Sequence, residues 1–75
     1  MKKLLSFIAK SIIALPNQLV VSETKEGQRI KLIISLPKEE ISTIIGRQGR
    51  IIKAIKTILA LKAKGKQFSI EVKEN

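Results

Sequence analysis

The chain has 75 residues, which is enough for one domain with one modest hydrophobic core but not for a deep catalytic cleft. Fifteen lysine and arginine residues against six acidic residues give a formal net charge of +9, which favours an anionic partner such as nucleic acid. The sequence lacks cysteine and histidine, so disulfides, thiolate nucleophiles and thiolate or imidazole metal ligands are excluded. We therefore expect residues 1–75 to form one binding domain that is not an enzyme and uses no metal and no cofactor.

The segment 1–16 joins two lysines to an apolar stretch, as a signal peptide does. Lys10 interrupts that stretch, no small-x-small cleavage site follows it, and the segment is too short and too polar to span a bilayer. An amphipathic helix fits better, because four aliphatic residues share one face at helical spacing: Leu5, Ile8, Ile12 and Leu15. We expect Pro16-Asn17 to end this helix, and the protein to be cytoplasmic and not bound to a membrane.

A β-hairpin is predicted after this helix. Residues 19–24 begin with apolar and β-branched side chains, and the turn Lys25-Glu26-Gly27-Gln28 leads into an alternating stretch, residues 29–36. In this second strand one face is apolar and the other is mostly polar. The apolar face should therefore lie in the core, with Ile30, Leu32, Ile34 and Leu36.

Two helices are predicted next. Pro37 suits a first helical turn, Glu39 and Glu40 complement a helix dipole, and isoleucines at helical spacing continue the helix to Gly46. A longer helix is predicted over residues 50–64, because lysines fill its last turn and a glycine lies just beyond it.

A last strand is indicated by the alternation of Phe68, Ile70 and Val72. Because two helices separate it from the hairpin, it can pair in parallel beside residues 29–36. The expected order is αββααβ. The sequence thus predicts an α+β fold, with a three-stranded mixed sheet covered on one face by three helices.

The link between the two predicted helices has the composition of an anion-binding loop. Gly46 and Gly49 bracket two polar residues, and so tight a turn needs residues that tolerate positive φ. The first amide groups of the following helix are unpaired donors at the positive end of its dipole, where a phosphate can bind. Arg47, Arg50 and Lys53 add positive charge there. Taken alone, G-x-x-G is also explained by a plain turn between helices.

The sequence around this loop, IIGRQGRIIKAI, resembles the signature of KH domains, in which an aliphatic pair precedes G-x-x-G and isoleucine recurs after it. The matching residues are Ile44, Ile45, Gly46, Gly49, Ile52 and Ile55. The αββααβ order resembles the bacterial, type II, KH arrangement. The whole chain resembles the small free-standing bacterial KH proteins of the KhpA type, above all over PKEEISTIIGRQGRIIKAIKTILALKAK.

The resemblance implies a protein that binds single-stranded RNA in a narrow cleft for about four unpaired nucleotides. It assigns the phosphate contacts to the loop and the start of the next helix, at Gly46, Arg47, Gln48, Gly49, Arg50 and Lys53. Aliphatic side chains should face the bases, since only two residues are aromatic, and by position we place Ile45, Ile41 and Ile34 there. For Ile34 and Ile41, core packing is the simpler explanation.

The same resemblance implies a bacterial post-transcriptional regulator or RNA chaperone. It also implies a homodimer, or a pair formed with a larger KH-containing protein.

Two other functions fit parts of the pattern. Two helices joined by a glycine turn also outline a helix-turn-helix reader of duplex DNA. Such a recognition helix should begin with polar side chains, but the stretch here is Arg50-Ile51-Ile52-Lys53. The other alternative is a KH fold used only for protein assembly, which acidic or bulky loop residues would indicate. Arg47 and Gln48 are neither.

The helix predicted over residues 50–64 carries a wider apolar arc than one core face requires. One stripe, with Ile52, Ile55 and Leu59, should pack on the sheet. An adjoining stripe has the spacing of a heptad seam, at Ile51, Ala54, Ile58 and Leu61. We expect this second stripe to form a two-fold homodimer interface, unless the first helix or a loop covers Leu61 within the monomer.

Overall fold

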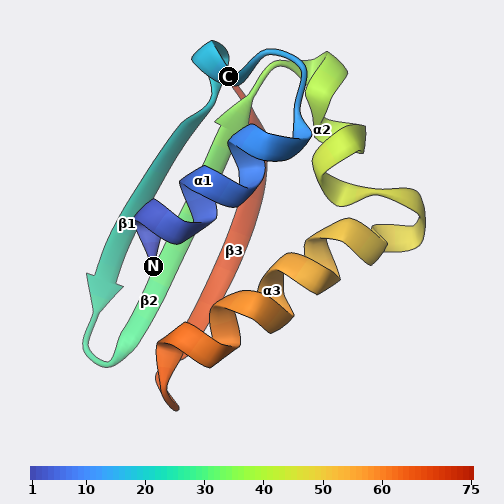
Figure 1. Ribbon diagram of the computed structural model, residues 1–75. Helices are drawn as coiled ribbons and strands as arrows, with labels where there is room; N and C mark the ends of the chain where they lie inside the picture. The colour runs from blue at the N-terminus through green and yellow to red at the C-terminus, as the bar shows by residue number, and fades with distance from the viewer.

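The computed structural model describes residues 1–75 and has the element order αββααβ (Figure 1). Its helices and strands are α1 (Lys2–Ile12), β1 (Val20–Glu26), β2 (Arg29–Leu36), α2 (Lys38–Ile45), α3 (Arg50–Ala63) and β3 (Gln67–Glu74). Two single 3₁₀ turns, Pro16–Gln18 and Arg47–Gly49, lie between these elements. The predicted order and types of the elements are confirmed.

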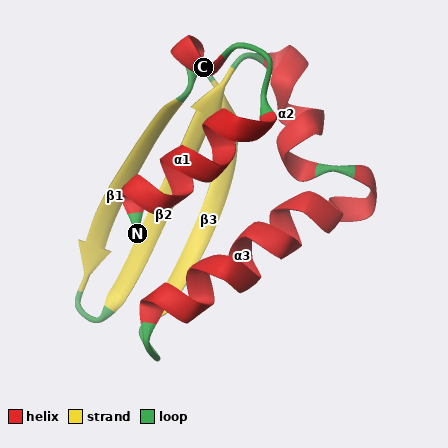
Figure 2. Cartoon of the chain, in the orientation of Figure 1, coloured by secondary structure: helices red, strands yellow, loops and turns green.

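The sheet has the strand order β1-β2-β3, so β2 is the central strand. β1 and β2 are antiparallel and joined by a two-residue turn, in which Gly27 has φ of 64° as such a tight hairpin turn requires. β3 returns through α2 and α3 and pairs in parallel with β2, Ile30 opposite Phe68. The helices lie on one side of the sheet and the other side is open (Figure 2). The predicted α+β fold with a mixed sheet is confirmed.

The core lies between the sheet and the helices. The predicted inward face of β2 is buried, with Ile30, Leu32, Ile34 and Leu36. The helices contribute Leu5 and Ala9 from α1, Ile44 from α2, and Ile55 and Leu59 from α3. This arrangement places the link between α2 and α3 at one end of the molecule, away from the sheet (Figure 1).

The first helix is shorter than the sequence pattern suggested. α1 ends at Ile12, and Leu15, predicted on its apolar face, lies outside the helix and is 44% exposed. The physical reason is Pro16, which cannot donate to the carbonyl of Ile12 and whose ring disfavours helical backbone at Leu15. Instead, the amide of Leu15 donates a hydrogen bond of 2.6 Å to the carboxylate of Glu40 on α2. None of the helices is long and apolar enough to cross a bilayer.

Candidate nucleic-acid interface

The loop between α2 and α3 has positive φ at three of its four residues. The φ angles are 77° at Gly46, 57° at Gln48 and 74° at Gly49. The amide of Gly46 closes α2 by donating to the carbonyl of Ser42 at 2.8 Å, and the amide of Gly49 donates to the carbonyl of Gly46 at 3.1 Å. Positive φ was expected at the glycines alone. Gln48 is a non-glycine residue in this region, a strained conformation that often accompanies binding sites.

The start of α3 carries an uncompensated positive dipole end. No side chain caps it, and its first turn contains no acidic residue. α2, by contrast, has Glu39 and Glu40 in its first turn. The amide of Arg50 donates to the carbonyl of Arg47, so the positive end of the helix dipole and the amides that follow Arg50 make the α3 end suited to hold an anion.

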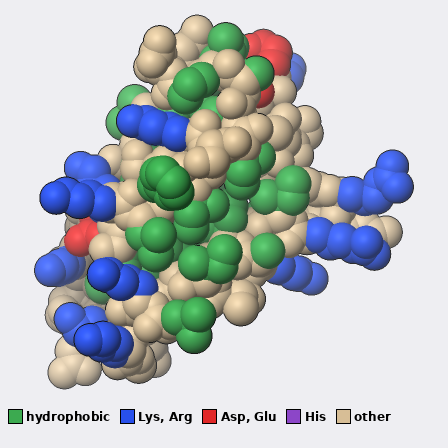
Figure 3. All heavy atoms as spheres, in the orientation of Figure 1, with side chains coloured by type: hydrophobic (Ala, Val, Ile, Leu, Met, Phe, Trp, Pro, Cys, Tyr) green, Lys and Arg blue, Asp and Glu red, His purple; other side chains and the backbone are tan.

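Three cations surround this helix end. Arg47, Arg50 and Lys53 are exposed and make no ion pair, because the only ion pairs join the amino terminus to Glu23 and Lys31 to Glu71. Figure 3 shows basic side chains projecting at the end of the molecule where Figure 1 places this loop. The structure thus brings together the predicted glycines, the two polar loop residues and the three cations.

The three aliphatic residues predicted beside the loop differ in their exposure to solvent. Ile41 and Ile45 on α2 are half-buried and keep part of their surface free. Ile34 is fully buried, with 0% of its surface exposed. The prediction that Ile34 faces RNA is therefore wrong, because β2 is the central strand and its inward side chains lie beneath the helices.

The narrow cleft expected beside the loop stays a prediction. Surface hollows occur elsewhere, and none of them is lined by a loop residue, by Ile41 or by Ile45. A ligand at the loop would therefore lie on an open surface made by the loop and the half-buried isoleucines.

The second apolar stripe of α3 differs in exposure along its length. Ile55 and Leu59 of the first stripe are buried on the sheet as predicted. Ala54 is exposed, Ile58 is 45% exposed and Leu61 is 81% exposed, while Ile51 is half-buried beneath the loop. No segment of the chain covers Leu61. The sequence alone had not decided whether the first helix or a loop would cover it.

An αββααβ fold with a G-x-x-G loop between its second and third helices defines a type II KH domain. A family model described as the KhpA/KhpB KH domain matches residues 2–73 of the chain. The chain belongs to this family.

Several relatives carry the name RNA-binding protein KhpA, and the three that follow align with nearly the full chain. The Clostridium acetobutylicum protein is 39% identical over 74 residues, which cover 96% of this chain and 99% of that protein. The Clostridium perfringens protein is 35% identical over the same shares. The Thermotoga maritima protein is 36% identical, over 96% of this chain and 97% of that protein.

Proposed function

We propose that the protein binds single-stranded RNA at the loop Gly46–Gly49 and at the start of α3, and that it catalyses no reaction. Phosphates lie against the loop backbone and the first amides of α3, and Arg47, Arg50 and Lys53 neutralise their charge. Bases lie against Ile41 and Ile45. We further propose that the protein acts in the cytoplasm as a post-transcriptional regulator or RNA chaperone; its relatives are named for RNA binding.

One observation carries this proposal. The three exposed cations without ion-pair partners stand around a helix end that has neither a capping side chain nor an acidic residue. A loop that only joined two helices would gain stability from an acid at this position, through both the dipole and the three cations. The absence of any such acid favours a binding site for an external anion.

Duplex DNA recognition is less compatible with the geometry. A recognition helix presents its first turns to base edges, but Ile51 and Ile52 in the first turn of α3 are half-buried. The test is a competition in which a labelled single-stranded RNA is displaced by unlabelled RNA and by a duplex of the same sequence. We expect displacement by the single strand at lower concentration; preferential displacement by the duplex would contradict the proposal.

We further propose that the exposed stripe of α3 forms a homodimer, with Ala54, Ile58 and Leu61 at its centre and Ile51 at its edge. The exposure of Leu61 and Ile58 supports this, since the two side chains leave apolar surface on a helix with nothing above it. Figure 3 shows hydrophobic side chains gathered over α1 and α3 with basic groups at the margins. Pairing with a larger KH-containing protein through the same stripe is the alternative use of this surface.

A further inference from the structure

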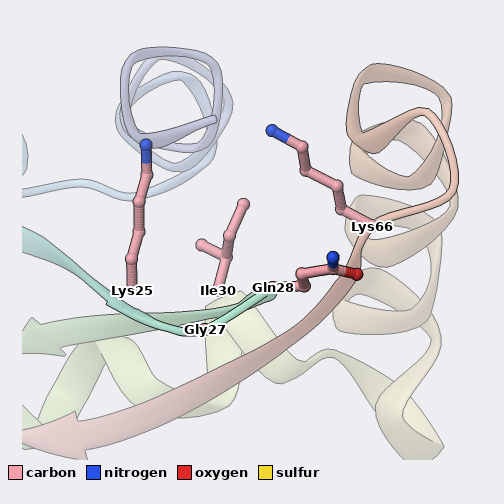
Figure 4. Close-up of a pocket in the computed structure, with 5 residues that line it drawn as sticks. All are labelled: Lys25, Gly27, Gln28, Ile30 and Lys66. Atoms are coloured by element: carbon pink, nitrogen blue, oxygen red, sulfur yellow. The ribbon is translucent and has the colours of Figure 1, made fainter.

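A basic hollow lies at the end of the sheet where β1 turns into β2. It has a volume of about 360 Å³ and is lined by Lys25, Gly27, Gln28, Ile30 and Lys66. Figure 4 shows Lys25 and Lys66 rising on either side of Ile30, so that their ammonium groups flank the opening. Strand pairing creates this arrangement, since Lys25 pairs with Ile30 and Ile30 with Phe68, two residues beyond Lys66.

More positive charge gathers beside the basic hollow. A neighbouring hollow shares Lys25 and Lys66 and adds Lys62 and Lys64 from the end of α3. Two acids lie near these lysines. Glu23 is 4.0 Å from the amino-terminal ammonium, and Glu26 lines a third hollow that also includes Lys66. Four lysines therefore meet at this end of the molecule, and none of them makes an ion pair.

Helix stability explains only part of this cluster. Lys62 and Lys64 lie at the carboxyl end of α3, where cations offset the negative end of the helix dipole. Lys25 is on a strand and Lys66 directly precedes one, so neither has that role. Both ammonium groups face the same hollow, so an anion between them would be attracted by both.

The basic hollow is separate from the loop site. It lies at the end of α3, whereas the loop Gly46–Gly49 lies at the start, and 14 helical residues at about 1.5 Å each put roughly 21 Å between them. Because about four nucleotides are held at the loop itself, a strand of that length centred on the loop would not also reach the basic hollow.

We propose that the basic hollow binds a phosphate group of the RNA backbone, as a second contact for strands longer than those the loop holds. The proposal rests on RNA binding at the loop and extends it. Lysine suits this contact because its compact charge binds a phosphate without reading the base. A contact at the hollow therefore raises the affinity for longer RNA strands, whatever their sequence.

The test compares two double variants that remove the same charge. Lys25→Gln with Lys66→Gln alters the basic hollow, and Lys10→Gln with Lys73→Gln alters two exposed lysines that make no ion pair and lie outside both the hollow and the loop. Each is titrated with an RNA of about four nucleotides and with one of roughly twenty. Thermal melting and light scattering check that fold and oligomeric state are unchanged.

For the longer RNA, we expect the hollow variant to lose about five- to 25-fold in affinity at 0.1 M salt. The loss of one or two phosphate contacts should also reduce the salt slope by about 0.7 to 1.4. The hollow variant should bind the four-nucleotide RNA, which contacts the loop alone, with the same affinity as the parent protein does. An unchanged affinity for the longer RNA, or a loss no larger than that of the control variant, would overturn the proposal. An equal loss for the short RNA would overturn it as well.

Discussion

Gly46 packs closely against the side chain of Ile51, so that a β-carbon added at Gly46 would be 2.6 Å from Cγ1 of Ile51. Its backbone, with φ 77° and ψ 173°, is in a region that only glycine adopts readily. At Gly49 the added atom would meet nothing closer than Cγ2 of Ile52, at 3.9 Å. The two glycines of the loop are therefore required for different reasons: Gly46 for close packing and its φ, Gly49 for its φ alone.

The first prediction follows from this difference. Gly46→Ala should lower the free energy of unfolding by at least about 2 kcal/mol, because backbone strain and a steric overlap add together. Gly49→Ala should cost only about 1 to 2 kcal/mol, the usual penalty for left-handed backbone. Urea unfolding of both variants measures the two costs. Equal costs would show that Ile51 moves aside and that its packing does not determine the residue at Gly46.

The second prediction concerns Glu40, the one charged side chain in the buried set, at 6% exposure. Its carboxylate accepts the amide of Leu15, so Glu40→Ala should leave that amide unpaired and cost about 1 to 3 kcal/mol. Glu39→Ala is the matched control, since this exposed neighbour lies in the same first turn of α2 and should change stability by less than about 0.5 kcal/mol. Similar melting temperatures for the two variants would argue against a structural role for the Leu15–Glu40 bond.

The third prediction tests the proposed dimer. Leu61→Asp should give a folded monomer where the parent is a dimer, because a charge would be buried in the apolar seam. Leu61 is 81% exposed in the single chain, so the change should not disturb the monomer fold. Light scattering gives the oligomeric state and circular dichroism the fold. A parent that is monomeric at tens of micromolar, a concentration where a dimer of micromolar affinity would form, would contradict the dimer.

The fourth prediction concerns salt. At the loop, about two to four phosphate contacts should give a logarithmic salt slope of about −1.4 to −2.8 for a four-nucleotide RNA, at roughly 0.7 per phosphate. Binding should be weak, with a dissociation constant of about a micromolar, because so small a footprint leaves little free energy after association. Titrations at several salt concentrations measure the slope. Affinity that does not change with salt would be incompatible with phosphate contacts.

The sequence was sufficient to predict those features of the fold that a local pattern of residues determines. Alternation in residues 29–36 gave the buried face of β2, and the glycine turn gave the hairpin. The two-helix crossover gave the parallel pairing of β3. The loop residues and cations of the candidate site were also accessible, because they are neighbours along the chain or one helical turn apart.

Features that depend on contacts between distant residues could not be predicted. The hydrogen bond between the amide of Leu15 and the carboxylate of Glu40 joins residues 25 positions apart, and no local pattern indicates it. For Ile34, the alternating pattern correctly indicated the core, and the placement beside RNA, which came from its position in the chain, was wrong. Lys25 and Lys66 meet only through the pairing of three strands, so no local motif indicates the basic hollow.

The central claim is that the loop Gly46–Gly49 holds RNA phosphates. Arg47→Asp combined with Gln48→Asp tests it most directly, since both side chains are exposed and the change leaves both glycines in place. An aspartate about 5 Å from a phosphate costs about 3 kcal/mol at an effective dielectric constant of about 20, a loss of about a hundredfold or more.

The control is Ser69→Asp combined with Lys73→Asp, which makes the same change in net charge on the open face of the sheet. The measurement is the affinity of parent, loop variant and control for a single-stranded RNA of about four nucleotides, beside their melting curves. The account predicts that only the loop variant loses binding and that its melting temperature matches the parent. A loop variant with the parent's melting temperature that still binds the RNA with the parent's affinity would contradict it.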